Sequence, residues 1–375
     1  MKKLLILQND LVLGGIWLVD KILAENLINK DFEVSIVSLR DYNKLEIDPR
    51  VKLLTINKDI PWTIVRKKEV IKPLLKLSIK KSYNLYKKRK EDLKLLNLDY
   101  LKLKNYIEDS KPDYILVTHY QLLDAIPDKY LSKTIYEQHN SFAATKKQLD
   151  NMRVLFKYKD KVKYVWLTKS TANIANKYFP NNTYIYNPIR FTENIENDVL
   201  KNKKLIVVSR ISKEKRIDLM IDIVNSIFED PKYNDWTFEI YGKGDLDLIK
   251  NKVDNQRIFY LGETDRPIDV LRSASINLNT SLYEGFSLSI LEAAYCYLPT
   301  ITFNFGESAL EEVINNKTGI VVEMNDIETY KQKLKCLMDD QELLKKLSLN
   351  AKEFSKKFKI DSFVEEWLKL FKEIE

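Results

Sequence analysis

Short apolar runs alternate with amphipathic stretches along most of this chain, and that alternation constrains its fold more than any other feature. Runs of this length are typical of buried strands, and the stretches between them have the spacing of helices. Strands that alternate with helices predict parallel sheets covered by helices on both faces. The runs fall into two series, 4–7, 34–38, 114–117, 134–136, 164–167 and 183–186, then 205–208, 238–241, 258–261, 276–278, 300–303 and 319–322.

Two series of strands predict two domains, because 375 residues are too many for one ordinary core. A polar stretch, 187–204, separates the series and is interpreted as the linker. We expect a first domain over 1–190, a second over 191–357, and a final helix over 358–375 that packs back on the first domain. In two facing domains of this class, the loops at the carboxyl ends of the strands would line a ligand cleft.

The composition, with 45% hydrophobic and 31% charged residues, is that of a globular protein. The first apolar run ends at residue 7, which is too short for a signal peptide, and no apolar stretch reaches the roughly 18 residues of a membrane span. Two cysteines, Cys296 and Cys336, make neither a disulfide framework nor a metal site. We therefore expect a cytoplasmic protein.

The net charge of +8 is concentrated in one segment. Residues 66–104 contain 14 Lys and Arg against 4 acidic residues, so this segment carries +10 and the rest of the chain −2. Within 70–86, apolar and lysine side chains recur at helical spacing, which predicts a basic amphipathic helix. Such a helix suits an anionic membrane surface, and the alternative is a solvated face over the first domain's core. Nucleic-acid binding is disfavoured, because no recognised module accompanies the charge.

The most informative segment is 281–294, Ser-Leu-Tyr-Glu-Gly-Phe-Ser-Leu-Ser-Ile-Leu-Glu-Ala-Ala, which follows a strand-like run. Its Gly-Phe-Ser turn opens a helix, where free backbone N–H groups and the helix dipole suit an anion or sugar hydroxyls. Glu292 lies among apolar helix residues, and a buried carboxylate needs a partner such as ribose or sugar hydroxyls. Alternatively, Glu284 is an ordinary carboxylate near a helix start and Glu292 pairs with a lysine.

A second segment, 207–218, follows the first strand of the second series. Arg210 leaves the strand end, and Lys215 lies near the start of the next helix. Two cations in such a turn can hold a diphosphate, or they can belong to an ordinary solvated turn. After the next strand, Gly242 opens a Gly-Lys-Gly turn that would let the backbone approach a ligand closely.

In the first half, Gly14 and Gly15 form a turn between the first strand and a helix. The two histidines of the chain, His119 and His139, each follow a strand-like run, so both are expected at the same edge of the sheet. A lone histidine is more often structural, but this shared position favours a function. Spacings typical of zinc sites, Walker phosphate loops or serine hydrolases do not occur, and we expect no metal site.

Together these segments resemble the family-4 retaining glycosyltransferases (glycosyl transferases group 1), whose α/β GT-B fold has two Rossmann-like, doubly wound domains facing a central cleft. Glu284 and Glu292, with seven residues between them and a Glu-Gly-Phe start, match the family's carboxylate pair. The segment 209–218 matches its diphosphate-binding segment, and Gly14-Gly15 its early glycine loop. The resemblance covers nearly the whole chain and is weakest over 45–105.

The resemblance implies a retaining, metal-independent hexosyltransferase with no cofactor. It would move a hexosyl or N-acetylhexosaminyl group from a UDP-sugar to a glycan or lipid-linked acceptor in surface-polysaccharide assembly. Arg210 and Lys215 would bind the diphosphate, Glu292 the ribose and Glu284 the sugar, with His139 near the reacting sugar. The other donor-site residues would be Gly15, Gly242, Gly285, Phe286, Ser287 and Leu288, and the acceptor-site residues His119, His139 and Asn140.

Two departures from the family pattern concern the acceptor and the sugar. Tyr297 stands where the family commonly has glycine, and Trp17 replaces a smaller polar residue after the glycine loop. Two other functions stay open: a sugar-nucleotide epimerase of the same fold, and a non-catalytic, membrane-associated binding protein. The retained Arg210, Lys215 and carboxylate pair argue against loss of catalysis.

Overall fold

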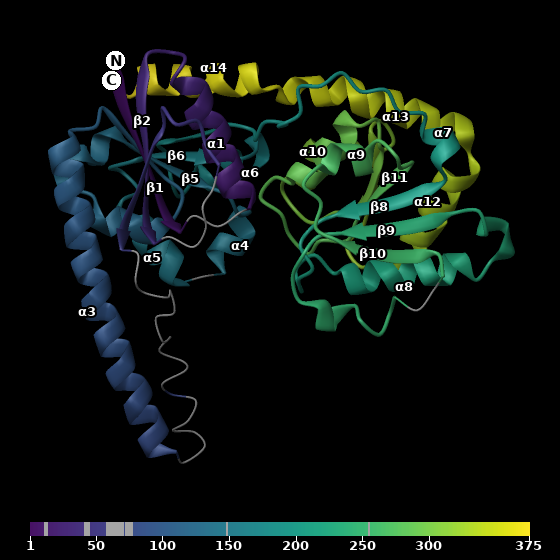
Figure 1. Ribbon diagram of the computed structural model, residues 1–375, viewed down its shortest axis with the longest axis horizontal. Helices are drawn as coiled ribbons and strands as arrows, with labels where there is room; N and C mark the ends of the chain where they lie inside the picture. The colour runs from purple at the N-terminus through teal and green to yellow at the C-terminus, as the bar shows by residue number, and fades with distance from the viewer. Residues whose placement is uncertain (11–13, 41–45, 58–70, 72–77, 148, 254–255) are drawn as a thin grey trace.

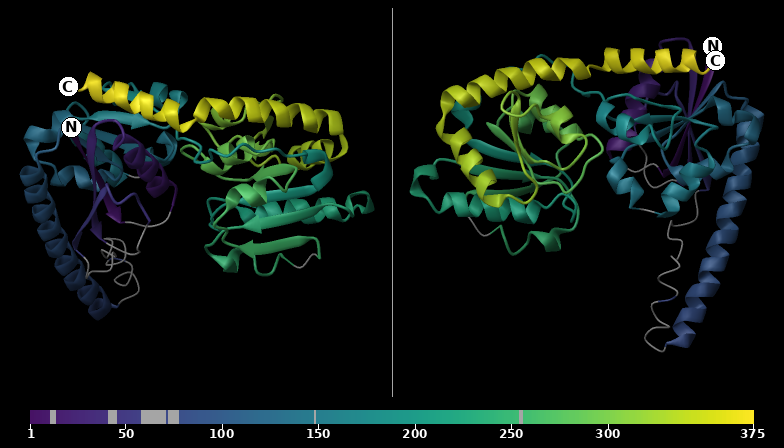
Figure 2. Two further views of the ribbon diagram at one scale, coloured as in Figure 1. Left: turned by 45° about the horizontal axis from the view of Figure 1, so that its top comes forward. Right: turned by 180° about the vertical axis from the view of Figure 1, so that it is seen from behind.

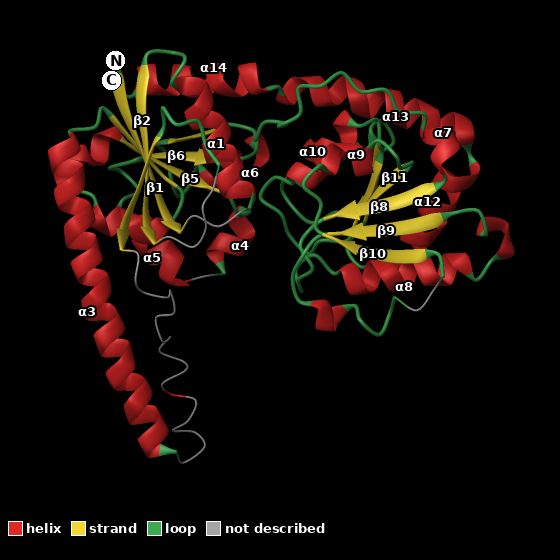
Figure 3. Cartoon of the chain, viewed as in Figure 1, coloured by secondary structure: helices red, strands yellow, loops and turns green. Residues whose placement is uncertain are grey.

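The computed structural model describes residues 1–10, 14–40, 46–57, 71, 78–147, 149–253 and 256–375, which form two α/β domains with one sheet each (Figure 1). Every strand pair in both sheets is parallel. Figure 3 shows the two groups of strands with their covering helices. The alternation of apolar runs and amphipathic stretches therefore predicted the fold class correctly.

The N-terminal sheet has seven strands in the order β3-β2-β1-β4-β5-β6-β7. Strand β3 was missing from the expected series, because its side chains at the sheet edge are exposed or half-buried and make no continuous apolar run. The strands are β1 Lys2–Asp10, β2 Phe32–Arg40, β3 Lys52–Asn57, β4 Tyr114–Val117, β5 Thr134–Gln138, β6 Lys163–Trp166 and β7 Asn182–Tyr184. The helices between them are α1 Gly15–Leu27, α3 Ile79–Ser110, η1 Tyr120–Ala125, η2 Asp128–Lys133, α4 Phe142–Lys146, α5 Leu149–Lys157 and α6 Lys169–Ala175.

The C-terminal sheet has six strands in the order β10-β9-β8-β11-β12-β13. The strands are β8 Lys204–Val208, β9 Thr237–Tyr241, β10 Ile258–Gly262, β11 Ile276–Asn279, β12 Thr300–Phe303 and β13 Gly319–Val322. The principal helices are α7 Val199–Asn202, α8 Ile217–Phe228, α9 Pro267–Leu271, α10 Leu288–Tyr295, α11 Ala309–Glu312, α12 Ile327–Asp339, α13 Gln341–Ser355 and α14 Ile360–Glu373, with short 3-10 turns η3 Pro231–Tyr233, η4 Leu246–Leu248 and η5 Lys356–Phe358.

The strand order places a topological switch point in each sheet. Strand β1 lies between β2 and β4, and β8 lies between β9 and β11. At such a point, the loops after two adjacent strands leave toward opposite faces and open a crevice suited to ligands. The loops after β8 and β11, 209–216 and 280–287, contain the central parts of the two segments that the sequence singled out, 207–218 and 281–294.

The chain passes from helix α13 on the C-terminal domain to helix α14, which packs on the N-terminal domain (Figure 2). Its buried aromatic face includes Trp367 and Phe371, and the ring of Phe371 lies 4.7 Å from that of Tyr114 on β4. Burial of this face removes large aromatic surfaces from water, which is the dominant favourable term in folding. The last helix therefore belongs to the core of the domain in which the chain begins.

Helix α3 projects away from the N-terminal sheet (Figure 1). Its C-terminal half is anchored by buried Leu103 and Ile107, and by an ion pair of 3.4 Å between buried Asp99 and Arg40. Its N-terminal half exposes Ile79, Tyr83 and Tyr86 among lysines. The helix expected over 70–86 is described only at residue 71 and from 78 onward, so its predicted side chains at 72, 74, 75 and 76 lie outside the described residues.

The two domains meet at a small apolar cluster and at a polar contact. The cluster contains Leu167, Ile189, Phe286, Leu291 and Phe358, from both domains and the segments between them. In the polar contact, the carboxylate of Glu311 on α11 accepts hydrogen bonds from the backbone N–H groups of Lys169 (3.1 Å) and Ser170 (2.6 Å) and from the Tyr186 hydroxyl (2.5 Å). An acidic side chain at the start of α6 is also favoured by the helix dipole.

Candidate functional site

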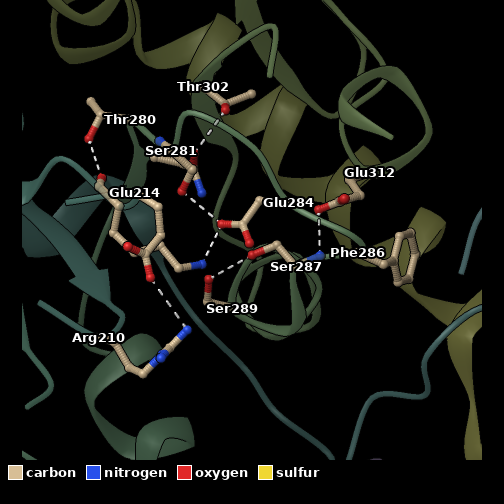
Figure 4. Close-up of polar contacts among 12 residues, drawn as sticks. Arg210, Glu214, Thr280, Ser281, Glu284, Phe286, Ser287, Ser289, Thr302 and Glu312 are labelled. Carbon is tan, nitrogen blue, oxygen red and sulfur yellow. Dashed lines mark hydrogen bonds and ion pairs between the residues drawn. The ribbon is translucent and has the colours of Figure 1, made fainter. Parts of the chain in front are cut away.

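The two sequence segments at the switch point of the C-terminal sheet meet through an ion pair between Lys215 and Glu284 (Figure 4). Both side chains are largely buried, at 14% and 11% exposed. The same Glu284 oxygen accepts a hydrogen bond of 2.7 Å from the Ser281 hydroxyl. The Thr280 hydroxyl donates to the carbonyls of Lys215 and Arg216, at 3.0 and 2.9 Å, which ties the two loops together. Lys215 and Glu284 are 69 positions apart in the sequence, and the fold brings them into one site.

Arg210 lies beside this pair and is open to solvent. Its guanidinium is 71% exposed, and its ion pair is with Glu214 at 3.7 Å. At that distance the pair is loose, so the guanidinium keeps N–H donors available for an anion. Arg210 and Lys215 thus offer two cations on one loop, one exposed at the surface and one largely buried in an ion pair.

The glycines of the Gly-Lys-Gly turn hold this loop in place. A Cβ added at Gly242, whose φ is +140°, would lie 1.9 Å from the carbonyl oxygen of Ser209. On either side of Arg210, the N–H of Ser209 donates to the Tyr241 carbonyl (2.9 Å) and that of Ile211 to the Lys243 carbonyl (2.8 Å). Gly242 therefore packs against the backbone that carries Arg210.

Glu312 is a fourth charged group of the site that sequence analysis missed. It is buried, and its carboxylate accepts a hydrogen bond of 2.9 Å from the Ser287 N–H at the start of α10. Burial, and then the nearby charge of Glu284, raise the pKa of Glu312 to about 8. Glu311 and Glu312 are adjacent in sequence on one short helix. No local pattern indicated that Glu311 contacts the N-terminal domain and Glu312 the site.

Glu292 has a protein partner in this structure. Its buried carboxylate is held by Arg190 from the interdomain segment through Nε (2.7 Å) and Nη2 (3.2 Å). Burial raises the pKa of Glu292, and Arg190 opposes that shift. The sequence alternative of a paired Glu292 is thus the arrangement present, with arginine in place of lysine. Paired carboxylate oxygens retain further lone pairs, so a ribose hydroxyl could still donate to them.

The N-terminal domain reaches the same loops through two close contacts. A Cβ at Gly285 would lie 2.1 Å from the carbonyl oxygen of His139, so these two backbones touch. A Cβ at Gly15 would lie 3.5 Å from Leu288 Cδ1. Because Gly285 and Leu288 flank the turn after Glu284, the early glycine loop and His139 both border the ion-paired site.

Some of the remaining predicted residues lie at this site, and others pack behind it or lie in the N-terminal domain. Ser287 donates through its N–H to Glu312. The Phe286 side chain is buried in the domain junction, 5.3 Å from the ring of Tyr186, so it supports the turn from behind. Asn140 is exposed, and His119 packs with Thr118, whose hydroxyl lies 3.1 Å from Nδ1.

A second polar group lies behind His139 within the N-terminal domain. Its Nε2 is 3.2 Å from an oxygen of Glu137 on β5, and Asp20 on α1 lies beside them. The ligand atoms of these three residues lie within 4.8 Å of one another, which is the one such group found among the described residues. The sequence drew attention to His139 alone. A carboxylate inside the apolar run of β5 was the signal for Glu137, because a charge in a buried strand needs a partner.

Comparison with known sequences finds similarity in the C-terminal part of the chain. Residues 189–354 match the family model described as "Glycosyl transferases group 1". A poly(ribitol-phosphate) alpha-N-acetylglucosaminyltransferase of Staphylococcus aureus is 29% identical over 170 residues, which cover 44% of this chain and 34% of that protein. A poly(glycerol-phosphate) alpha-glucosyltransferase of Bacillus subtilis is 25% identical over 194 residues, covering 49% and 28%. The aligned parts thus span about a third of the length of these relatives.

Comparison of structures covers the whole chain. A crystal structure of a mutant of S. aureus TarM in complex with fondaparinux, alpha-GlcNAc-glycerol and UDP superposes with a TM-score of 0.73 at 17% identity, over 99% of this chain and 100% of that one. This likeness, with the two parallel sheets, confirms the GT-B fold expected from the sequence. No helix in the described part of the chain has both the length and the hydropathy needed to cross a bilayer.

Proposed function

Because residues 189–354 of this chain match the family model of the glycosyl transferases group 1, we propose that the protein is a glycosyltransferase. It moves a hexosyl or N-acetylhexosaminyl group from a UDP-sugar to a glycan or lipid-linked acceptor, in the assembly of bacterial surface polysaccharide or glycoconjugate. The observation that carries the proposal is the Lys215–Glu284 pair beside exposed Arg210, at the switch point of the C-terminal sheet. Relatives whose names describe sugar transfer to polyol-phosphate polymers support the acceptor class, and the UDP in the TarM complex supports the donor class.

The proposed donor site uses the two cations for the departing diphosphate. Arg210 binds it through the planar fork of its guanidinium, and Lys215 acts as a compact charge. Negative charge grows on this leaving group as the sugar–phosphate bond breaks, so cations already fixed beside it lower the barrier. In this proposal the two side chains take up the charge, and no metal ion or cofactor takes part.

In this proposal the bound donor takes the place of the ion pair between Lys215 and Glu284. Lys215 and Glu284 neutralise each other in a largely buried position. A bound donor presents phosphate to Lys215 and sugar hydroxyls to Glu284, so each partner exchanges one polar contact for another and neither charge is left unpaired. Glu292, already paired with Arg190, accepts from the ribose. Gly15, Gly285 and Leu288 border the sugar.

The reaction proposed is a transfer with retention of anomeric configuration. The acceptor hydroxyl attacks on the face from which the diphosphate leaves, and a phosphate oxygen of the donor takes its proton. His139 lies next to the Gly285 backbone and so beside the proposed sugar position. His119 and Asn140, from the neighbouring loops of the N-terminal domain, are proposed to contact the acceptor.

A lipid-linked acceptor would place the protein at the cytoplasmic face of a membrane. The two cysteines are free thiols, Cys296 buried and Cys336 exposed, as is usual in a reducing compartment. The exposed apolar side chains of α3, Ile79, Tyr83 and Tyr86, lie among lysines, which suits peripheral contact with anionic lipid. Sedimentation with anionic vesicles at low salt tests this contact, and protein that stays in the supernatant would contradict it.

A donor screen tests the function itself. UDP-, GDP- and ADP-sugars are offered with and without glycan acceptors, and product formation and melting temperature are measured. A donor that binds only the folded protein stabilises it by about 2.7 kcal/mol at 100 times its Kd. We expect UDP to raise the melting temperature and UDP-sugars to be turned over, with an α-configured product from an α-configured donor. An epimerised sugar released without acceptor would indicate an epimerase, and no response to any nucleotide would indicate a non-catalytic protein.

A further inference from the structure

The strongest unassigned feature is the buried polar group behind His139. Asp20 comes from α1 and Glu137 from β5, and both residues are fully buried. His139 follows β5 directly, and its Nε2 lies 3.2 Å from Glu137 Oε2. The Gln8 amide on β1 donates a hydrogen bond to Asp20. Four residues from three segments of the N-terminal domain, β1, α1 and the end of β5, thus converge on one small volume near the carboxyl ends of β1 and β5.

This group holds too much negative charge for its surroundings unless a proton balances it. Apart from the 3.2 Å contact between Glu137 Oε2 and His139, Asp20 Oδ1 and both oxygens of Glu137 lack a hydrogen-bond donor within the described part of the chain. Burying an ionised carboxylate is unfavourable unless a cation or several donors accompany it. The imidazole of His139 is the group in contact that can become a cation, and its protonation turns the 3.2 Å contact into a charge-assisted pair.

The directions of the pKa shifts agree with that geometry. Burial lowers the pKa of His139, but the charge and hydrogen bond of Glu137 and the charge of Asp20 outweigh it, and the net direction is upward. Burial and the charge of Glu137 raise the pKa of Asp20. The second histidine, His119 after β4, behaves in the opposite way, because burial and the neighbouring His139 lower its pKa to about 4.

We propose that Glu137 and Asp20 are positioning residues that keep the His139 ring protonated and fixed in orientation behind the Gly285 turn. An imidazolium carries two N–H donors, and with Nε2 committed to Glu137 it retains a second one. The backbone of the same residue touches the turn that follows Glu284, since a Cβ at Gly285 would lie 2.1 Å from the His139 carbonyl oxygen. The role of this charge in transfer, as a fixed donor and cation beside the sugar, rests on the proposed function.

The composition of the chain makes the proton directly observable, because it contains only two histidines. With 13C-labelled histidine, NMR titration gives two ring signals, and His119→Gln leaves that of His139 alone. We expect His139 to titrate above 6.5, the ordinary histidine value. In Glu137→Gln its midpoint falls by about one pH unit or more, and Asp20→Asn lowers it less. Glu25→Gln, a carboxylate change on the same helix as Asp20, leaves it unchanged.

The proposal is overturned if the His139 signal of the wild-type chain titrates below about pH 6.5, the ordinary histidine value. This measurement uses the wild-type chain alone, so it does not depend on whether a variant folds. A midpoint unmoved in folded Glu137→Gln would do the same. Repeating the titration with Zn2+ and then with EDTA tests whether a metal ion, in place of a proton, balances the charge of this group. An unchanged titration curve supports protonation of His139, and a metal-dependent loss of the titration overturns the proposal. None of these measurements needs a substrate, so they fail or succeed independently of the proposed function.

The kinetic consequence separates positioning from a merely structural role. Transferase activity is expected to fall as the pH rises through the pKa of His139. This fall forms the alkaline limb of the pH–rate profile, and we expect the limb to move to lower pH in Glu137→Gln. Glu137→Asp, which keeps the charge, restores the limb toward its wild-type position. A uniform loss of rate at all pH values, with no movement of the limb, would contradict the positioning role.

Discussion

At the scale of single residues, the site is a set of charges that are balanced in pairs. Lys215 with Glu284, Arg190 with Glu292, and His139 with Glu137 each put a cation against a carboxylate that is largely buried. Removing one member leaves the other charge buried and unpaired, which costs more than the pair contributes. Arg210 is the exception, since it is exposed and its pair with Glu214 is loose. The pairs give structure, and Arg210 is the cation most open to a ligand.

Substitution of Arg210 by alanine tests that distinction. Because the side chain is 71% exposed, the melting temperature is expected to stay within about 1 °C. The kcat for a UDP-sugar is expected to fall by about 10²–10³-fold, as when one preorganised donor to a developing charge is lost. Lys213→Ala, an exposed cation on the same loop, is the control and should keep its rate. An undiminished rate in Arg210→Ala would remove this residue from the donor site.

Glu312 predicts a pH dependence of stability. Its folded-state pKa of about 8 lies above its usual value, so the native protein holds a proton that the unfolded chain has released. The stabilisation is complete below the usual glutamate pKa and is lost as the pH rises through about 8. Glu312→Gln keeps the acceptor for the Ser287 N–H and removes the titration. Its melting temperature relative to wild type should therefore increase by about 3 °C or more from pH 5 to pH 8.5.

The control for this experiment is Glu328→Gln on α12, an exposed carboxylate that is 77% accessible. Its melting curve should follow wild type at every pH. If the difference in melting temperature between Glu312→Gln and wild type stays constant across the pH range, Glu312 is ionised in the folded protein. The predicted pH dependence of stability is then wrong.

At the scale of elements, the sequence predicted the strands well and the partners of buried charges poorly. Strands β8, β9, β11 and β12 were predicted to within one residue, because each carries apolar side chains either in a run, as in β8, or in alternation with polar ones. The half-exposed edge strand β3 has no such run and was missed. The pairing of Glu292 with Arg190 joins residues 102 positions apart, and no local pattern encodes such a contact. Periodicity reports which face of an element is buried, and the tertiary fold decides what lies against it.

The turn after β9 gives an element-scale prediction. Gly242→Ala puts a Cβ within 1.9 Å of the Ser209 carbonyl oxygen at a φ of +140°, so the β8–α8 loop must move. Displacement of Arg210 should weaken UDP binding by about tenfold or more, measured by calorimetry, since misplacement of a positioning group by 1 Å can cost about a hundredfold in rate. Gly306→Ala is the matched control, because its φ of +118° imposes similar strain while no atom lies within 4 Å. Equal losses in both variants would assign the effect to backbone strain.

At the scale of the whole molecule, one carboxylate links the two domains. Glu311 on α11 accepts hydrogen bonds from Lys169, Ser170 and Tyr186, all of which belong to the N-terminal side. These contacts hold the C-terminal domain in the arrangement that brings Gly285 against His139. A ligand that needs both domains binds only this arrangement, so its apparent Kd rises as the population of this arrangement falls.

Glu311→Ala therefore should open the molecule without changing either core. Hydrogen bonds to a charged group are worth about 1.5–3 kcal/mol, so losing them shifts the balance toward open forms by roughly tenfold to a hundredfold. We expect a larger radius of gyration in solution scattering and a raised KM, with a kcat little changed at saturation because bound substrate restores closure. Excess donor and acceptor should return the scattering curve to that of wild type. Tyr186→Phe removes one of the three hydrogen bonds and should give the same changes to a smaller extent. If the scattering curve and the KM of Glu311→Ala are the same as those of wild type, the apolar junction around Phe286 holds the domains together without Glu311.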